Sequence, residues 1–520
     1  MPVSSHTRAC ASVARALQMA DTEAHPCHVV GGFVRDAVLG RTSRDIDLAV
    51  AGSPFQIAQE VARALGASYV PLDEAHSVAR VVLQLPRGTV RGLGEAETTP
   101  VVIDFAGYEG TLDTDLRRRD FTIDAIAVPA AVVASAFTGQ HVEWERIAQH
   151  AVDPTGGLQD LSAKKLRATG PSVFEADPGR LLRAVRLARE FSLSIEPRTE
   201  AAIRASAGRL PEVAAERTRE ELLRLLALPD AGESLHALDR LGLLTSLFPE
   251  LERCRGVEQP TVHFWDVLEH SIQTVSTFEM VTAESDWRYG NEEMLDYVPD
   301  DPACRVHLEE TVSTEASRSV LIKLACLLHD IAKPQTRVLD DTGRARFLGH
   351  AADGAAMVRD MLQRLRFSTS EASYVEMLVR QHLRPAQMSC EGMPTSRAVY
   401  RFFRDSDGAG IGVLYVAMAD YLACRGPLFT MSEWQAVCSL VRFILSEHRR
   451  QEAVIAPSKI IDGHELMRAL GLGPGPAVGT LLETIRESQA AGLVSSSEEA
   501  IQLARKTLES ERSTVVRTAK

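Results

Sequence analysis

The first 130 residues contain short runs whose apolar and polar positions indicate secondary structure. The runs "HVVGG", "RDIDLAV", "VARVVLQL" and "VVIDFAG" have the length and the Val and Ile content that are typical of β-strands. Between them, "FVRDAVLG" and "PFQIAQEVARALG" have helical spacing, and Gly66 closes the second. This region therefore predicts a small mixed sheet with helices.

After Leu158 the strand patterns nearly vanish, and one helical pattern follows another with Pro and Gly between them. The expected fold class is α+β multidomain, with a mixed-sheet head and an extended all-α body. The segment 282–317 is an exception, because it is acidic and lacks sustained periodicity. It predicts a mobile surface insertion.

Length and composition narrow the class of protein. A chain of 520 residues is too long for one core, so we expect three or four domains. No apolar run reaches the ~20 residues of a membrane span. Eight cysteines without a C-x-x-C pair favour reduced thiols and a cytoplasmic protein. The Arg/Ser/Ala-rich start predicts an amphipathic helix, with an organellar transit peptide as the alternative. Composition indicates no oligomeric state.

The net charge of −13 argues against a nonspecific nucleic-acid binder. Arginines are nevertheless dense in "LRRRD" and "RLLRAVRLAR". A local basic surface of this kind can hold a phosphate backbone on an acidic protein.

Two carboxylates lie on one face of a predicted strand. In "RDIDLAV", Asp45 and Asp47 project together while the apolar residues face a core. Upstream, a strand leads through Gly31 and Gly32 into a helix, where backbone N–H groups can approach phosphate, and Arg35 can bind a phosphate oxygen. D-x-D alone also fits a solvated edge strand, and a glycine pair alone fits a turn. Their combination predicts a nucleoside triphosphate site with divalent ions.

The segment "GGFVRDAVLG…RDIDLAV" resembles the first motif of the class II tRNA nucleotidyltransferase and bacterial poly(A) polymerase family, which belongs to the polymerase β-like superfamily. Four further segments resemble the later motifs in family order: "LRRRDFTIDAIAV", "DPTGGLQDLSAKKLRATG", "FEADPGRLLRAVRLAREF" and "ERTREELLRLL". The resemblance implies a polymerase β-like head and spans about the first 230 residues.

The resemblance also implies site residues. It assigns Asp45 and Asp47 to catalytic Mg²⁺ ions, with Asp104 of "VVIDFAG" as a candidate third carboxylate or, equally, a structural aspartate. The residues that match nucleotide contacts are Gly32, Arg35, Arg119, Asp177, Arg180, Arg183 and Arg186.

Helical geometry places Asp177, Arg180 and Arg183 on one arc of about 120°, where they can contact a base edge, while Arg189 points away. Two positions depart from the family pattern. Ala176 stands where the family usually has Glu, and Asp124 stands where it usually has Asn. Of the roles that the resemblance implies, base selectivity is the one that these departures put in question.

Histidines and aspartates recur through the middle of the chain. An adjacent His-Asp at the end of the apolar helix "LACLLHDIAKP" is costly to bury unless it is paired or bound to metal. The order of these residues resembles the HD phosphohydrolase superfamily, which implies a metal site that contains His270, His329, Asp330, Asp420, His350 and His382. Imidazole ligands favour a transition metal such as Ni²⁺, Mn²⁺ or Co²⁺. A structural helical core is the alternative.

The predicted domains are a nucleotidyltransferase head (1–150), a helical neck that selects nucleotide and binds RNA (151–255), an HD domain (256–430) and a helical tail (431–520). The tail is expected to contact tRNA, with a capping bundle that makes no RNA contact as the alternative. The leading hypothesis is complete or partial CCA addition to tRNA from CTP and ATP. Poly(A) synthesis is the alternative within the class. The alternative outside it is an HD phosphodiesterase or phosphatase whose head binds RNA.

Overall fold

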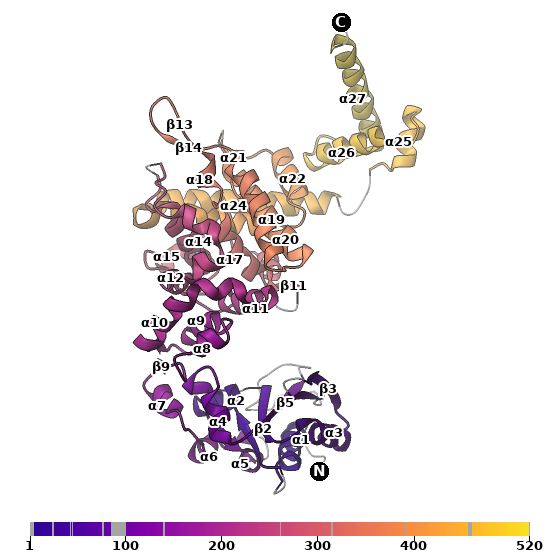
Figure 1. Cartoon of the computed structure of the whole chain (residues 1–520). Helices are drawn as coiled ribbons and strands as arrows, with labels where there is room; N and C mark the ends of the chain where they lie inside the picture. The colour runs from indigo at the N-terminus through magenta and orange to yellow at the C-terminus, as the bar shows by residue number, and fades with distance from the viewer. Residues whose placement is uncertain are drawn as a thin grey trace. The chain divides into compact units, whose positions relative to one another are not determined.

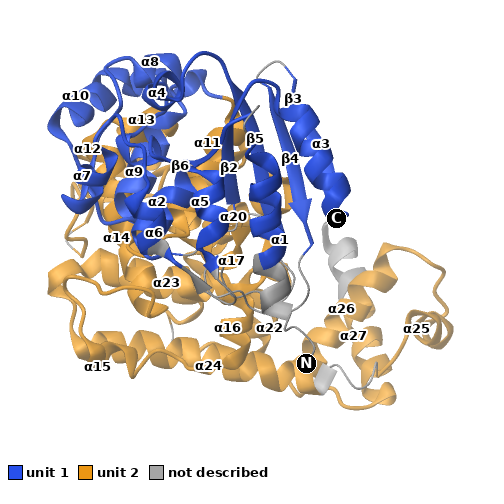
Figure 2. Cartoon of the chain, turned by 90° about the horizontal axis from the view of Figure 1, so that it is seen from below, with its two compact units in different colours: residues 1–213 blue, residues 214–520 orange. Residues whose placement is uncertain are grey.

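The computed structural model describes residues 5–22, 25–41, 43, 45–74, 77–84, 100–138, 141–260, 262–313, 316–390, 392–455 and 460–518 (Figure 1). They form two compact units, Met1–Val213 and Ala214–Lys520 (Figure 2). The first unit holds the sheet, and the second is mostly helical.

A six-stranded sheet with the order β3-β4-β5-β2-β1-β6 organises the first unit. Its strands are β1 (Cys27–Val30), β2 (Asp45–Ala51), β3 (Ser68–Asp73), β4 (Val78–Leu83), β5 (Val101–Tyr108) and β6 (Ala127–Pro129). Only β2 and β5 pair in parallel, so the predicted mixed sheet is confirmed. Sequence patterns missed β3, whose residues are mostly exposed, and β6, which is three residues long.

The helices of the first unit pack around this sheet. The first predicted helix is confirmed as α1, which contacts α3 and α5, and α3 begins at Pro54 and ends before a left-handed Gly66. The helices before residue 150 are α1 (Ser5–Ala20), α2 (Gly32–Val38), α3 (Pro54–Leu65), α4 (Leu112–Arg117), η1 (Thr122–Asp124), α5 (Ala130–Ala136) and α6 (Trp144–Gln149), with a short hairpin of β7 (Phe137–Thr138) and β8 (His141–Val142). They are followed by α7 (Gly157–Ser162), β9 (Lys165–Leu166), α8 (Val173–Ala176), α9 (Arg180–Glu190), β10 (Ser194–Ile195), α10 (Pro197–Ser206) and η2 (Ala207–Glu212).

Helix α7 packs closely against η1. The Asp153 carboxylate accepts the backbone N–H groups of Gly157 and Leu158, both at 2.8 Å, and the Thr122 hydroxyl donates to Asp160 at 2.7 Å. A Cβ added at Gly157 would lie 2.0 Å from the Thr122 carbonyl oxygen. Glycine is therefore required at this position by the approach of two backbones.

Gly157→Ala is expected to destabilise the first unit by about 1–3 kcal/mol, because the added methyl group collides with a backbone atom that has no freedom to move aside. Gly208→Ala is the matched control, since an added Cβ there meets no described atom within 4 Å. Chemical denaturation of both variants measures the difference. Equal stability of the two would contradict the close packing of α7 on η1.

The second unit is a helical body, as predicted. Its elements up to the first HD residues are α11 (Ala215–Leu226), α12 (Ala231–Arg240), α13 (Leu243–Leu247), η3 (Pro249–Cys254), α14 (Val267–Val281), α15 (Glu292–Leu295), α16 (Pro302–Glu309), β11 (Thr311–Ser313), β12 (Ala316–Ser317) and α17 (Arg318–Leu328). The remainder comprises α18 (Lys333–Thr336), β13 (Arg337–Leu339), β14 (Ala345–Phe347), α19 (His350–Arg364), α20 (Thr369–Gln381), α21 (Arg384–Met388), α22 (Ser396–Asp405), α23 (Gly410–Arg425), η4 (Gly426–Leu428), α24 (Met431–Ile455), α25 (Gly463–Leu470), α26 (Pro476–Ala490) and α27 (Ser497–Thr518).

The segment 282–317 is more ordered than its sequence predicts. It contains α15, α16 and two short strands, and Trp287, Met294 and Cys304 are buried. The Met294 carbonyl accepts the indole N–H of Trp434 at 2.9 Å. The expected lack of regular structure is therefore wrong for the described residues, because a few widely spaced side chains anchor short elements without producing a period. A mobile surface insertion stays a prediction. Residues 314 and 315 lie outside the described residues.

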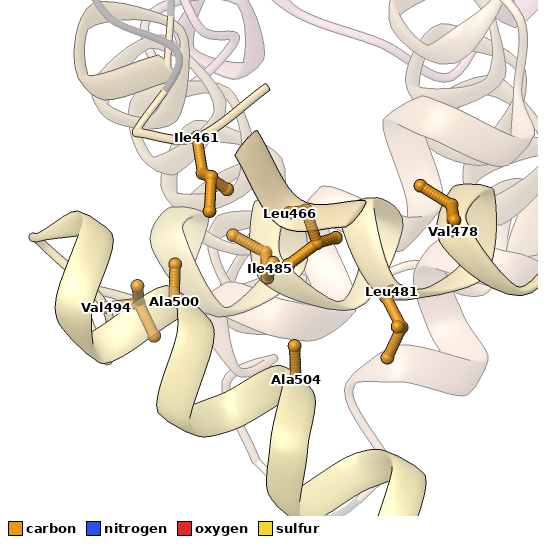
Figure 3. Close-up of a cluster of buried hydrophobic side chains, with 8 residues drawn as sticks. All are labelled: Ile461, Leu466, Val478, Leu481, Ile485, Val494, Ala500 and Ala504. Atoms are coloured by element: carbon orange, nitrogen blue, oxygen red, sulfur yellow. The ribbon is translucent and has the colours of Figure 1, made fainter. Parts of the chain in front are cut away.

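The tail of the chain has a small core of its own. Figure 3 shows its buried side chains, which come from α25, α26, α27, the residues just before α25 and the segment between α26 and α27: Ile461, Leu466, Val478, Leu481, Ile485, Val494, Ala500 and Ala504. In the described part of the chain, no helix combines the length and the apolar composition that a bilayer crossing needs.

Candidate active sites

Three carboxylates meet at the centre of the head sheet. Because β2 and β5 are parallel neighbours, Asp47 lies directly beside Asp104 in the register. One oxygen from each of Asp45, Asp47 and Asp104 falls within 4.8 Å of the others. The sheet thus brings together two segments that are more than fifty residues apart in the sequence. Clustered hard oxygen ligands of this kind suit a divalent ion.

The carboxylates are held close to one another despite their like charge. Burial, and next the Asp45 carboxylate, raise the pKa of Asp47 to about 6, while the Arg119 guanidinium opposes the shift. Gly31 borders the same place with φ 73°, and an added Cβ there would lie 3.2 Å from Asp47 Oδ2 and 3.3 Å from Arg119 Nη1. The glycine turn and Arg119 therefore lie at the carboxylate cluster, and nucleotide binding by Arg119 stays a prediction.

Arg80 is a site residue that sequence reasoning missed. It lies on β4 opposite Asp104 and donates to both carboxylate oxygens, each at 2.7 Å. The only signal in the sequence was an arginine that interrupts the apolar run "VARVVLQL". Asp104 is therefore partly neutralised by Arg80, whereas the metal-ligand role of Asp104 stays a prediction.

Arg35 has a different environment from the one expected of a phosphate ligand. Its side chain is 8 % exposed and forms ion pairs with Asp36 at 2.9 Å and with Asp124 at 2.6 Å. Gly32 begins α2 beside it, where a Cβ would lie 3.4 Å from the Arg35 guanidinium. Phosphate binding by Gly32 and Arg35 stays a prediction, and the Arg35 charge is already paired in the protein.

The helix predicted to select the nucleotide begins later than the spacing of its charged residues suggested. Helix α9 starts at Arg180, and Asp177 is extended, with φ −147° and ψ 98°. The assignment of Asp177 to a helical arc is therefore wrong, and the cause is Pro178, since a residue before proline avoids the helical region. Asp177 still lies near Arg180, at 3.8 Å from its Nε, and accepts the Gly179 N–H at 3.0 Å.

Two further arginines of α9 are paired with carboxylates. Arg183 contacts Asp120 at 2.7 Å and Asp124 at 3.3 Å, and its side chain is 37 % exposed. Arg186 pairs with Glu190 at 2.6 Å. Nucleotide contacts by Arg180, Arg183 and Arg186 stay predictions, and the structure places Arg183 against the second-motif segment.

The second candidate site lies inside the helical body, where five segments converge. His270 lies on α14, His329 and Asp330 directly follow α17, His350 begins α19, His382 follows α20 and Asp420 lies on α23. Three overlapping groups from this set have ligand atoms within 4.8 Å of one another: His270–His329–Asp330, His329–His382–Asp420 and Asp330–His350–His382. The structure therefore brings all six predicted residues together.

Hydrogen bonds orient the imidazoles toward the centre of this cluster. The Nδ1 atoms of His329, His350 and His382 each contact the backbone carbonyl oxygen three residues earlier, at 2.7–2.8 Å. A carbonyl oxygen only accepts, so Nδ1 carries a proton and Nε2 faces inward. Backbone contacts of this kind typically orient metal-binding histidines.

The charged groups around the inward-facing Nε2 atoms favour binding of a cation. His350 Nε2 lies 3.2 Å from Asp330 Oδ1 inside the protein. Burial alone would lower the pKa of His329, but Asp330 and Asp420 outweigh burial and raise it to about 10. Burial would raise the pKa of Asp330, but the charges of His329 and Lys333 outweigh burial and hold this pKa well below its usual value. The buried Asp330 and the partly exposed Asp420, both among imidazoles, thus stabilise positive charge, as a divalent ion requires.

Two neighbours of this cluster were missed in the sequence. Lys333 Nζ lies 2.5 Å from Asp330 Oδ2 and 2.6 Å from Gln259 Oε1. The His263 ring lies 5.5 Å from that of His270, centroid to centroid, and burial, followed by the charge of Lys333, lowers its pKa to about 4. The spacing in "HDIAKP" was the signal for Lys333, whereas nothing in "PTVHFWD" indicated His263.

Family models match most of the chain. A poly A polymerase head domain matches residues 27–167, a probable RNA and SrmB-binding site of polymerase A matches 192–254, and an HD domain matches 267–424. The A-adding tRNA nucleotidyltransferase of Deinococcus radiodurans is 32% identical over 481 residues, which cover 91% of this chain and 93% of that protein. The chain belongs to the tRNA nucleotidyltransferase and poly(A) polymerase family. The resemblance that the motifs indicated is thereby confirmed.

Other members of the tRNA nucleotidyltransferase family are similarly related. The CC-adding enzyme of Thermus thermophilus is 33% identical over 478 residues, which cover 91% of each chain. A solved CCA-adding enzyme with CTP has a TM-score of 0.61 at 20% identity and covers 96% of this chain and 94% of its own. This likeness confirms the fold of a mixed-sheet head and a helical body. Membership of this family, together with the HD domain, also implies dependence on divalent metal ions.

Proposed function

We propose that the chain is a tRNA nucleotidyltransferase, which transfers CMP and AMP from CTP and ATP to the 3′-hydroxyl of tRNA and releases pyrophosphate. The observation that supports this most directly is the cluster of Asp45, Asp47 and Asp104 beside the glycine turn. Relatives that cover about nine tenths of the chain are an A-adding and a CC-adding enzyme. Solved proteins of the same fold include complexes with CTP, with ATP and with tRNA.

Each part of the head has a role in this reaction. Asp45 and Asp47 would hold Mg²⁺, for which carboxylate oxygens are suitable ligands. The bound ions supply charge that neutralises the triphosphate and lowers the pKa of the attacking hydroxyl. Arg119, beside Asp47, would contact the triphosphate, and the N-terminus of α2 at Gly32 would direct backbone N–H groups toward phosphate. Asp177, Arg180, Arg183 and Arg186 would line the place of the incoming base.

The direct test uses tRNA transcripts that lack one, two or all three nucleotides of the CCA end, each incubated with a single labelled nucleoside triphosphate. We expect CMP addition to transcripts that lack a cytidine and AMP addition to those that lack only the terminal adenosine. An RNA without tRNA structure should accept little, which separates this activity from poly(A) synthesis. Absence of addition to every transcript would refute the proposed function.

Arg180→Ala and Asp177→Ala are expected to change the ratio of CMP to AMP addition by about tenfold, because a lost hydrogen bond from a charged group has about that effect. Affinity for tRNA should stay unchanged. Arg189→Ala is the matched control, since Arg189 lies half a turn around α9 from Arg180. Competition between the two labelled nucleotides measures the ratio. If tRNA binding falls while the ratio stays fixed, this segment contacts RNA instead.

A second activity is supported by the buried cluster in the body. We propose that the six HD residues hold a divalent transition metal and hydrolyse phosphate esters. The inward Nε2 atoms of the imidazoles favour Ni²⁺, Mn²⁺ or Co²⁺ over Mg²⁺. Lys333, which is paired with Asp330, carries a positive charge that would attract the phosphate group. A metal bound with an open position supplies an activated water.

A further inference from the structure

One buried carboxylate joins two arginines from different motifs in the first unit. The side chain of Asp124 is 3 % exposed. Its Oδ1 accepts a hydrogen bond from Arg35 Nη1 at 2.6 Å, and its Oδ2 accepts one from Arg183 Nη2 at 3.3 Å. Each oxygen therefore serves a different guanidinium. We call these three residues, Arg35, Asp124 and Arg183, the arginine clasp.

The Arg35 end of the clasp is fixed. Its guanidinium pairs with Asp36 at 2.9 Å and lies over the Phe191 ring at 4.1 Å. Phe191 directly follows α9, so Arg35 contacts both Asp124 and the end of the helix that carries Arg183. A buried guanidinium with two carboxylates and an aromatic face has little freedom to move.

The Arg183 end of the clasp is held by two aspartates and is partly exposed. Arg183 Nε lies 2.7 Å from Asp120 Oδ2, so carboxylates of the second-motif segment contact two of its nitrogens. More than a third of the side chain nevertheless remains exposed. The aspartates thus orient the guanidinium of a partly exposed side chain.

We propose that Asp124 is a positioning residue that presets Arg183 for the incoming nucleoside triphosphate, and that it thereby controls nucleotide affinity and not tRNA affinity. This inference rests on the proposed function of the head. Asp124 stands where the family usually has Asn, and both of its oxygens accept, whereas an amide would offer one acceptor oxygen and direct N–H donors at the second arginine. Orienting Arg183 in advance removes the cost of ordering it when the nucleotide binds.

Asp124→Asn is expected to raise the KM for CTP or ATP about tenfold, while kcat and the KM for tRNA change less than about twofold. Asp36→Asn is the matched control, because it removes the other carboxylate from Arg35 and leaves both Asp124 contacts in place. We expect its nucleotide KM to stay within about twofold of the wild type.

A double-mutant cycle tests whether Asp124 acts through Arg183. In an Arg183→Ala background, Asp124→Asn should add no further increase in KM.

If the asparagine variant fails to fold, Asp124→Glu keeps the charge near Arg35 but displaces both oxygens, and it should also raise the KM. The rise in melting temperature on adding CTP gives a readout that does not depend on turnover, and it should shrink in Asp124→Asn and not in Asp36→Asn.

The outcomes separate this inference from the proposed function. If the wild type adds no nucleotide, the proposed function fails. If the wild type is active but Asp124→Asn lowers the melting temperature without changing the nucleotide KM, the clasp is only structural. Equal effects of Asp36→Asn and Asp124→Asn, or additive effects of Asp124→Asn and Arg183→Ala, would also overturn the inference.

Discussion

Asp47→Asn is expected to reduce nucleotide addition about a thousandfold or more, since it removes a metal ligand that contributes several kcal/mol to the reaction. The fold should survive, because burial and the Asp45 carboxylate disfavour charge on Asp47. We therefore expect an unchanged or slightly higher melting temperature in Mg²⁺-free buffer. Single-turnover addition to tRNA and thermal unfolding measure the two effects.

The control for this prediction is Asp113→Asn, which breaks an exposed ion pair with Arg117 in the same unit. Its addition rate should stay close to that of the wild type, because exposed pairs contribute little. Asp45→Ala should behave like Asp47→Asn, since both residues belong to one ligand group. Near-normal addition by either variant would refute the assignment of the head cluster as the catalytic site.

His329→Ala and Asp330→Asn are expected to remove the metal of the body and, with it, hydrolysis of 2′,3′-cyclic phosphate and of a generic phosphoester. Each variant deletes a ligand from the centre of the cluster, and losing a ligand weakens metal binding severely. Nucleotide addition should change less than about twofold, because Asp45 and Asp47 belong to the other unit. Metal content by mass spectrometry and both activities are measured on the same preparations.

His236→Ala serves as the control for the body site. His236 pairs with Glu269 at 3.0 Å in the same unit but does not belong to the cluster, so metal content should be unaffected. Ni²⁺, Mn²⁺ or Co²⁺ should support hydrolysis better than Mg²⁺. If the wild type binds no metal and hydrolyses neither substrate, the histidines are a structural core. In that case the two variants would lose only thermal stability.

Much of the head was predictable because its signals are local. The alternation in "RDIDLAV" directs Asp45 and Asp47 to one face of a strand whatever lies beyond it. Glycine in the turn at Gly31 is similarly required by a positive φ. The structure confirms both features. By contrast, the extended conformation of Asp177 was missed although Pro178 signalled it, because the helical spacing of the arginines masked that local rule.

The partners of charged residues were much less predictable. Arg35 has the same local sequence whether it contacts phosphate or a buried aspartate, and only the fold brings Asp124 to it across 89 positions. The same holds for Arg80 and Asp104, which are 24 positions apart and meet through strand pairing. Pairing between separate segments depends on register, and short-range periodicity does not specify it.

The sequence by itself determined the class of the protein, the order of its elements and the residue types that carry its chemistry. These follow from periodicity, turn residues and ordered motifs, which act over a few residues. Only the tertiary structure decided which of those residues meet. It joined Asp47 to Asp104, gathered the HD residues from five segments and placed Arg183 and Arg35 on one carboxylate. The physical reason is that burial and ion pairing depend on distances in space, which packing sets across long separations along the chain.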